Sequence, residues 1–334
     1  MKFIQLLSIL PAILLLQSCF KEDERVPGHP AGDLRTDTLG MTQYYVYQLY
    51  YDLGSGQVMA SNAKESWDLG FDCSSTGYHL ILNTANFMKV SDAGPLSFPQ
   101  ALDTANRSWH FDKSDGNPDS NAIGRWFQVL SGDTLSKNHI YILDRGMDQY
   151  GDPLGFRQLV IDSLKQGTYY FRIAWLDGSN PQSYAIQKDA TRNYIHFTFR
   201  FGGSVQLLEP PKDAWDLLFT QYTTLLFTNT GEPYPYLVTG VLLNPNGVSA
   251  AKDTLHPFLS FSLAEASGLT YSTALDIIGY DWKYYDFDAA SYSVMTDRFY
   301  AIRDTDAYPY KLRFIGFYNH LGEKGFPVIE VQGL

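Results

Sequence analysis

Short runs of alternating apolar and polar residues, separated by glycine-containing turns, fill most of the chain. Residues 44–59 read YYVYQLYYDLGSGQVM, which is an aromatic run, a turn with two glycines and a second short run. Residues 194–208, YIHFTFRFGGSVQLL, repeat that order. A period of two residues interrupted by such turns is typical of antiparallel hairpins. The pattern therefore predicts two similar β-hairpins.

A Trp-Asp-Leu sequence follows each predicted hairpin. The chain reads ESWDLGFDCSSTGYHLILNTAN over 65–86 and DAWDLLFTQYTTLLFTNT over 213–230, and both stretches continue to an Asn. Alternation places the Trp, the Leu and the next aromatic residue on one face of a strand: Trp67, Leu69 and Phe71, then Trp215, Leu217 and Phe219. Large apolar side chains at this spacing are typical of a core, so Trp215→Ala is expected to cost ~3–5 kcal/mol.

The similarity between the two halves continues downstream. Residues 139–164 and 298–318 each read as a strand, an Asp/Gly turn and a second strand. A last apolar strand follows each of them, at 168–176 and at 327–334. The two Trp residues lie 215 − 67 = 148 positions apart. Trp-Asp also marks propeller blades, but these recur every ~40–45 residues, so a duplicated domain explains the spacing better.

We therefore predict an all-β fold of two tandem, similar antiparallel domains, at 41–190 and 191–334, with few short helices. One helix is predicted around 272–278, where the pattern is mixed. The aromatic content of 15% agrees with this fold class, because aromatic residues favour pleated surfaces. A net charge of −11 argues against nucleic acid as a partner, since binding to phosphates needs a basic surface.

The first residues predict export and lipidation. Residues 1–18 have a Lys and then a short apolar run, as in a signal peptide, and the run ends at Leu-Gln-Ser-Cys, which resembles a lipoprotein cleavage box. Cys19 would then be acylated, and 19–40 would be a flexible linker to the membrane. Lys21 and the acidic residues after it resemble the signal that sends some lipoproteins to the outer face of the outer membrane. A plain charged tether is the alternative.

Signatures of catalysis are absent from the sequence. It has no Gly-x-Ser-x-Gly elbow, no His-Glu-x-x-His, no phosphate-binding glycine loop and no Cys-x-x-Cys. We therefore predict a protein that is not an enzyme and has no metal site. Residues 115–121, DGNPDSN, space oxygen side chains as calcium loops do, but they lack the usual Gly and Glu positions. A turn-rich loop is the alternative interpretation.

Several motifs resemble the HmuY family of haem-binding lipoproteins. The similarity is strongest over about 210–334, through WDLLFTQYTT, YLVTGVLLNP, YDWKYYDF and the final stretch from FYAIRDTD onward. It is weaker over 41–190, through SWDLGFD and YILDRG. The resemblance implies an all-β fold, a lipid anchor at the outer membrane, and capture of haem outside the cell. It also implies transfer of the haem to an outer-membrane receptor, and axial ligation of the iron by His or Met.

The haem ligands cannot be placed by motif, so the candidates come from position along the chain. His110 lies 110 − 67 = 43 residues after its Trp, and His256 lies 256 − 215 = 41 residues after its own. Both fall in long loop segments with aromatic neighbours, where a binding site can form. These two residues are the predicted haem ligands, and solvated loop histidines are the alternative. The remaining histidines fall in strands, turns or the linker, and Met88 and Met295 suit a core better.

Two functions follow from these observations. The first is a non-catalytic lipoprotein at the cell surface that binds haem for iron acquisition. The second is a surface module of another class, one that binds glycans on exposed aromatic rings or serves as a structural or adhesive subunit. An apolar slot for the macrocycle would favour the first, and clustered exposed aromatic rings would favour the second.

Overall fold

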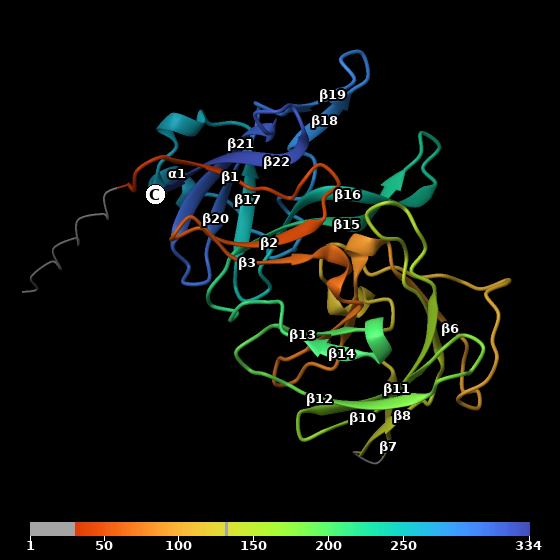
Figure 1. Ribbon diagram of the computed structural model, residues 1–334. Coiled ribbons are helices and arrows are strands. Elements are labelled where there is room, and N and C mark those ends of the chain that lie inside the picture. Colours follow the sequence, from red (N-terminus) through yellow and green to blue (C-terminus); the bar gives the residue numbers. More distant parts are fainter. Residues whose placement is uncertain (1–30, 131–132) are drawn as a thin grey trace, which may run out of the picture. The chain divides into compact units, whose positions relative to one another are not determined.

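The computed structural model describes residues 31–130 and 133–334, and Ala31–Leu334 form one compact unit. The predicted signal peptide at 1–18, the predicted lipidation site Cys19 and the linker up to residue 30 lie outside the described residues. The regular secondary structure of the described chain is almost entirely antiparallel strands, joined by turns and loops (Figure 1). The prediction of an all-β fold with few short helices is confirmed.

The strands form two lobes with the same plan. The first lobe, residues 67–206, has a five-stranded sheet in the order β12-β11-β10-β9-β6 and a four-stranded sheet in the order β14-β13-β4-β5. Its strands are β4 (Leu69–Asp72), β5 (Leu80–Leu82), β6 (Lys89–Asp92), β7 (Phe127–Leu130), β8 (Asp133–Ser136), β9 (Tyr141–Asp144), β10 (Phe156–Lys165), β11 (Thr168–Ala174), β12 (Gln182–Gln187), β13 (Tyr194–Thr198) and β14 (Ser204–Gln206). Strands β7 and β8 pair as a separate hairpin.

The second lobe comprises residues 31–66 and 207–334. Its five-stranded sheet has the order β1-β22-β21-β20-β17, and its four-stranded sheet has the order β16-β15-β2-β3. Its strands are β1 (Arg35–Thr38), β2 (Tyr47–Asp52), β3 (Gln57–Ala63), β15 (Leu217–Phe227), β16 (Pro233–Leu243), β17 (Ser249–Asp253), β18 (Lys283–Asp286), β19 (Ser291–Val294), β20 (Phe299–Arg303), β21 (Pro309–Tyr318) and β22 (Lys324–Gly333). Strands β18 and β19 form a hairpin.

The helices are short and lie between strands. The α-helix α1 (Leu263–Ser267) begins after Ser262, which forms a capping box with Glu265. The 3₁₀ turns are η1 (Lys64–Ser66), η2 (Thr84–Asn86), η3 (Pro118–Ser120), η4 (Arg200–Gly202) and η5 (Phe258–Ser260). The helix predicted around 272–278 is wrong, because that segment lacks helical hydrogen bonds. Its residues instead pair with strands on both sides, as Ser272 does with Ala250.

Each lobe has its own apolar core between its two sheets. In the first lobe, Leu69 and Phe71 of β4 pack with buried residues of the five-stranded sheet. In the second lobe, Leu217 and Phe219 of β15 do the same. All four side chains are fully buried. The core positions predicted for these two strands are therefore confirmed, and the predicted hairpins and late strand pairs are present as well.

Each of the two hairpins pairs with the Trp-Asp strand from the other half of the sequence. The hairpin β2–β3 pairs through β2 with β15, the second Trp-Asp strand. The hairpin β13–β14 pairs through β13 with β4, the first Trp-Asp strand. Figure 1 shows the orange strands β2 and β3 beside β15 and β16. A boundary at residue 190 therefore does not separate the sheets, and the tandem duplication itself stays a prediction.

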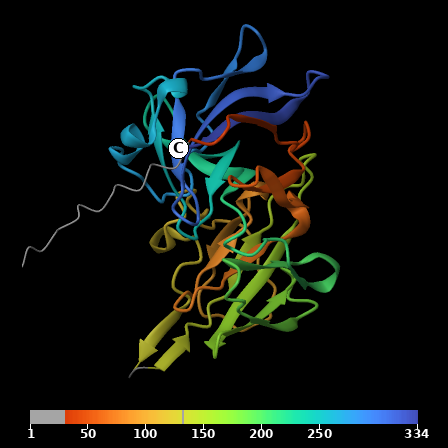
Figure 2. The same ribbon diagram turned by 90° about the vertical axis from the view of Figure 1, so that its left-hand side faces the viewer.

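The two ends of the described part of the chain pair with each other. Strand β1 pairs with β22, so that Arg35 lies opposite Val331. Figure 2 shows the red segment that contains β1 running beside the blue C-terminal strands. Leu39 follows β1 and is fully buried in the core of the second lobe. The predicted flexible linker over 19–40 is thus wrong for residues 35–40, because backbone pairing and apolar burial fix them.

The repeated Trp-Asp sequence is explained by a shared hydrogen-bonding unit. Asn83 donates from its side chain to the carbonyl of Trp67, at 2.7 Å. Asn244 donates in the same way to the carbonyl of Trp215, at 2.6 Å. In both lobes the Asn backbone N–H also bonds the carbonyl of the Asp that follows the Trp. The counterpart of Asn83 is therefore Asn244, and not the Asn at the end of the 213–230 stretch.

Candidate functional site

A cavity of about 620 Å³ lies between the two four-stranded sheets. Side chains of β2, β15 and β16 line it from the second lobe, and side chains of β5 and β13 line it from the first. The lining passes from buried residues to exposed ones such as Lys113, Asn117 and Pro245, so the cavity opens to solvent. Pockets that hold small organic ligands usually measure ~300–1,000 Å³, and this volume lies in that range.

Equivalent aromatic pairs from the two lobes face this cavity. Trp67 meets His196 edge-on, with ring centroids 4.6 Å apart. Trp215 meets Tyr50 edge-on at 4.9 Å. His196 and Tyr50 occupy matching places. His196 lies opposite Gly70 and Tyr50 lies opposite Leu218, and each of these partners is the third residue after its Trp. Both lobes thus contribute the same kind of wall.

The position of the two Trp rings corrects the sequence prediction. Both rings are buried, but they line the cavity and are absent from the apolar cores that hold Leu69, Phe71, Leu217 and Phe219. Trp67 precedes β4 and is not part of that strand, so the period of two does not extend back to it. The Trp67 indole N–H donates to Oε1 of Gln48 in the other lobe, at 2.8 Å.

His196 is a buried neutral imidazole in the cavity wall. Its side chain is 4% exposed, and Nδ1 has no hydrogen-bond partner within the described structure. Burial, together with the smaller effect of the positive charge of Arg192, lowers the pKa of His196 to about 3. The ring is therefore uncharged at neutral pH. A neutral ring without a full set of protein partners suits contact with a ligand.

Glu209 is a second buried polar group at the cavity. It accepts hydrogen bonds from the backbone and side chain of Asn193 and from the backbone of Tyr194. Burial raises the pKa of Glu209 to about 7, although these hydrogen bonds favour the ionised form. The carboxyl group is therefore only partly ionised near neutral pH, so Glu209 contributes less than a full negative charge to the cavity.

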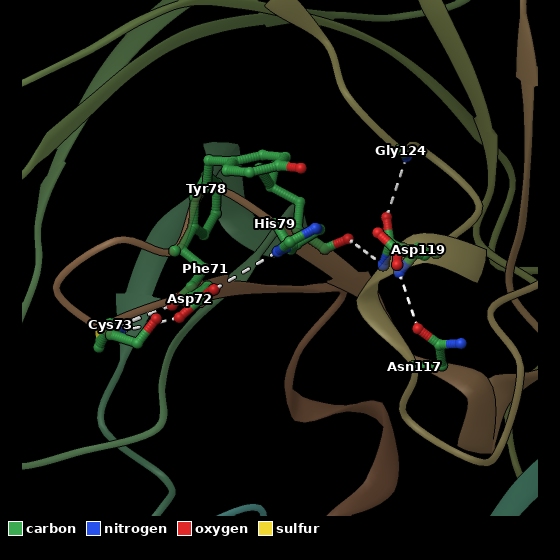
Figure 3. A network of polar contacts seen from close by, with 12 residues as sticks. Phe71, Asp72, Cys73, Tyr78, His79, Asn117, Asp119 and Gly124 are labelled. Carbon is green, nitrogen blue, oxygen red and sulfur yellow. Dashed lines mark hydrogen bonds and ion pairs between the residues drawn. The ribbon is translucent and has the colours of Figure 1, made fainter.

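A polar network lies at one rim of the cavity (Figure 3). Nδ1 of His79 lies 3.6 Å from a carboxylate oxygen of Asp72, and the imidazole stacks on Tyr78 at 4.1 Å. Figure 3 also shows Asn117 and Asp119 in the loop that had calcium-like spacing. In this loop Oδ1 of Asn117 accepts from the N–H of Asp119, at 3.0 Å. Such bonds to the loop's own backbone are what the turn-rich interpretation predicts.

The two histidines predicted as haem ligands lie on different lobes. His110 is exposed, and its backbone pairs with Val90 at the edge of the first five-stranded sheet. His256 is exposed after β17, and its Nδ1 lies 2.8 Å from a carboxylate oxygen of Asp253. No contact joins the two rings in the part of the chain that the structure describes. The structure therefore does not bring them together as a pair, and their role stays a prediction.

The sequence pattern predicts strands at His79 and His196 and singles out neither residue; the structure confirms a strand for His196 in β13, whereas His79 directly precedes β5. The period of two shows that a strand residue is buried on one side, but it does not show that a cavity lies behind it. Met88 is fully buried in the core of the first lobe, as predicted. His196 could have been singled out only by its position in the second hairpin of the repeat, which pairs with the first Trp-Asp strand.

The fold is all-β, with two similar lobes and a cavity lined by both of them. A family model described as HmuY protein matches residues 44–330, and the chain belongs to the HmuY family. A search of curated proteins finds no match. Over the described part of the chain, the helices are too short or too polar to cross a bilayer.

Three solved structures are similar to this chain at low identity. Apo PinO from Porphyromonas gingivitis has 9% identity and a TM-score of 0.29, over 90% of this chain and 97% of that one. The apo HmuY analog of Tannerella forsythia has 8% identity and a TM-score of 0.21, over 91% and 98%. A protein from Bacteroides vulgatus, described as HmuY-like and heme binding, has 15% identity and a TM-score of 0.18, over 49% and 89%. The family assignment rests on the family model.

Proposed function

We propose that this protein binds haem at the cell surface for iron acquisition and has no catalytic activity of its own. The observation that supports the proposal is the match of the HmuY family model over residues 44–330. Capture of haem and its transfer to an outer-membrane receptor are what membership in this family implies. The absence of catalytic motifs from the sequence agrees with a binding role.

The proposal is tested by adding haem to the purified protein that starts at Ala31. We expect a Soret band that is shifted from that of free haem and saturates at a fixed stoichiometry. The shape of the spectrum reports whether His, Met or neither ligates the iron. His110→Ala and His256→Ala, tested alone and together, show whether either predicted ligand is needed. A spectrum that stays that of free haem at all ratios would exclude haem binding.

Anchoring at the outer membrane by the acylated Cys19 is part of the same proposal. It is supported by the order of charged, apolar and Leu-Gln-Ser-Cys segments at the start of the chain. We expect Cys19→Ser to move the protein from the outer-membrane fraction to the soluble fraction. Protease added to intact cells is expected to digest the parent protein. Retention of Cys19→Ser in the membrane would contradict the lipid anchor.

Glycan binding remains a second candidate because of one exposed aromatic cluster. Tyr234 and Tyr236 on β16 are exposed and meet edge-on, and in the turn of the β18–β19 hairpin Phe287 is 86% exposed beside Tyr285. Exposed flat rings are the usual platform for sugars. Binding of soluble oligosaccharides that is lost in Tyr236→Ala would favour this function, and no binding to a broad oligosaccharide panel would remove it.

A further inference from the structure

The segment 254–264, which contains η5 and the start of α1, exposes leucines while it packs on a core. The three are Leu255 (88% exposed), Leu259 (72%) and Leu263 (42%). Phe258 and Phe261 of the same segment point inward and are buried in a small apolar cluster. The segment contains no Asp, Glu, Lys or Arg, in a chain of which 18% is charged. Exposed apolar side chains without charges between them are typical of a surface that contacts another apolar surface.

Two buried charged side chains fix the backbone of this segment. Nζ of Lys311 donates to the carbonyl of Phe258, at 2.8 Å. Oδ1 of Asp253 accepts from the backbone N–H groups of Leu255 and His256, at 2.7 and 2.9 Å. Turning the leucines inward would take hydrogen bonds away from two buried charges, which is costly. The leucines are therefore held outward by the fold.

The exposed segment lies at the point where the described chain begins. The backbone N–H of Gly32 donates to the carbonyl of Gly333, at 3.1 Å. The next residue, Leu334, is buried in the same apolar cluster as Phe258 and Phe261. Figures 1 and 2 both show the red start of the described chain beside the end marked C. The chain thus enters the second lobe next to the segment that carries the leucines.

The predicted lipid anchor would keep this end of the lobe close to the membrane. Ala31 follows Cys19 by 31 − 19 = 12 residues, and a chain of this length spans at most ~43 Å. The turn between β21 and β22 lies at the other end of the sheet, because β22 has 10 residues and is about 33 Å long. Of the two ends of this sheet, the one with the leucines is the one that the anchor holds.

We infer that Leu255, Leu259 and Leu263 insert into the lipid surface and orient the anchored protein on the membrane. This orientation rests on the lipid anchor at Cys19, which is part of the proposed function but leaves open which face meets the lipid. A protein partner fits less well, since three leucines on one loop offer far less than the ~800 Å² per partner that a stable interface buries. A lipid surface needs no such area, because the anchor already supplies a high effective concentration.

The depth of a spin label at position 259 tests this orientation. The full-length acylated protein with Leu259→Cys is labelled with a nitroxide and placed in vesicles of phosphatidylethanolamine and phosphatidylglycerol. Cys73 is buried and Cys19 is acylated, so the introduced thiol is the one that reacts. The reference is the same labelled protein with Cys19→Ser, which stays in solution. In the vesicles we expect collisions with a water-soluble nickel chelate to fall by roughly five-fold or more, and collisions with oxygen to rise.

Leu321→Cys with the same label is the matched control. Leu321 is 70% exposed and lies in the turn between β21 and β22, at the far end of the sheet. Its label is expected to collide with the nickel chelate equally in vesicles and in solution. Adding Leu255→Ser and Leu263→Ser to the protein labelled at 259 is expected to restore much of the access to the nickel chelate, because less apolar surface holds the loop in the lipid.

Flotation of the vesicles separates a failure of the orientation from a failure of the anchor. If the protein floats with the vesicles but the label at 259 meets the nickel chelate as it does in solution, the leucines face water and the inferred lipid contact is wrong, while the anchor stands. Shielding from the chelate without a gain in oxygen collisions would mean that a protein surface covers the loop, which also overturns the lipid contact. If the parent does not float, the anchor and the orientation fail together. Shielding with a gain in oxygen collisions at 259 but not at 321 supports insertion.

Discussion

Asp68 and Asp216 occupy the same place in the two lobes, yet only one of them has a cationic partner. Arg145 donates to both carboxylate oxygens of Asp68, at 2.7 and 3.2 Å, and both side chains are buried. Arg145 directly follows β9, whereas the residue that directly follows the matching strand β20 is Asp304. The second lobe thus has a second carboxylate where the first has a guanidinium.

Because the second lobe has Asp304 at the position that Arg145 occupies in the first lobe, the ionisation of Asp216 differs from that of a salt-bridged carboxylate. Burial, together with the smaller effect of the charges of Asp304 and Asp52, raises the pKa of Asp216 to about 7. Backbone N–H groups of Leu53 and Thr305 donate to the carboxylate and oppose this rise. Because the folded-state pKa lies above the unfolded value of 3.8, the folded state holds a proton that the unfolded state has lost. The contribution of Asp216 to stability therefore falls as the pH rises from about 4 to about 7.

Asp304→Asn is expected to stabilise the protein at pH 8 but not at pH 5. The variant keeps Oδ1, which accepts from the backbone N–H groups of Asp306 and Tyr308. At pH 8 the loss of the charge beside ionised Asp216 is expected to raise the free energy of unfolding by about 1 kcal/mol. At pH 5 Asp216 is protonated and the gain disappears. Urea unfolding at both pH values measures this, and a gain of equal size at both would show that Asp216 is not involved.

His196 shows what a single residue can and cannot reveal in the sequence. Its neighbours Ile195 and Phe197 are apolar, so its place in a strand follows from the local pattern, but alternation puts His196 on the face away from the core and does not predict its burial. The cavity that it lines also needs β2, β15 and β16, which are supplied by distant segments. The position of His110 and His256 in long loops was likewise correct, but their separation onto two lobes depends on pairing that no local pattern records.

The Trp-Asp strands combine two roles within a few residues. Leu217 and Phe219 face the core of their own lobe, and Trp215 two positions earlier faces the cavity between the lobes. The sequence suggested one core face for all three, because the period of two was extended across the start of the strand. The strand itself, its partner hairpin type and its core residues were predictable, since each depends on neighbours in the sequence.

Phe219→Ala and Trp215→Ala are expected to differ in cost. Phe219 is fully enclosed, so the free energy of unfolding is expected to drop by about 3–5 kcal/mol. Trp215 borders an existing cavity that opens to solvent, so its removal leaves less new empty volume, and a smaller loss of about 1–3 kcal/mol is expected. Chemical unfolding of both variants under the same conditions measures the difference. A larger loss for Trp215→Ala would place its ring in a closed core.

The exchange of hairpins could not be predicted from the sequence. The two hairpins share one sequence pattern and the two Trp-Asp strands share another, so local signals fit two pairings equally well. The structure pairs β2 with β15 and β13 with β4, across many intervening residues. The choice between the pairings depends on contacts that form only in the complete fold, which is why the expected boundary at residue 190 does not separate the sheets.

At the scale of the whole molecule, the second lobe is assembled from both ends of the described chain. The backbone N–H of Gly32 donates to the carbonyl of Gly333 at 3.1 Å, beside the pairing of β1 with β22. The first lobe is inserted between the two parts of the second as one continuous segment, residues 67–206. The two lobes therefore have the same arrangement of sheets, but the first is formed by one continuous segment and the second by two.

A circular permutant is expected to fold and to bind the same ligands. Joining Leu334 to Ala31 through a short Gly-Ser linker and opening the chain after the exposed residue Leu207 would make each lobe one continuous segment. No strand pairing is lost, so a melting temperature within a few degrees of the parent is expected, measured by circular dichroism. Opening the chain inside β10 is the control that should not fold. A permutant that stays unfolded would show that the present chain order is required.

The pairing of β1 with β22 also determines the order in which the strands can pair while the chain is synthesised from its N-terminus. The strands of the first lobe are complete once residue 206 has emerged, and that lobe can close while the rest is still being synthesised. Strands β1 to β3 emerge before it. Strands β2 and β3 can pair with each other at once, but β2 finds its second partner only when β15 follows, and β1 finds its partner only when β22 follows. We expect β1 to be the segment that waits longest with unpaired edges, and therefore the one that most needs protection from aggregation during synthesis.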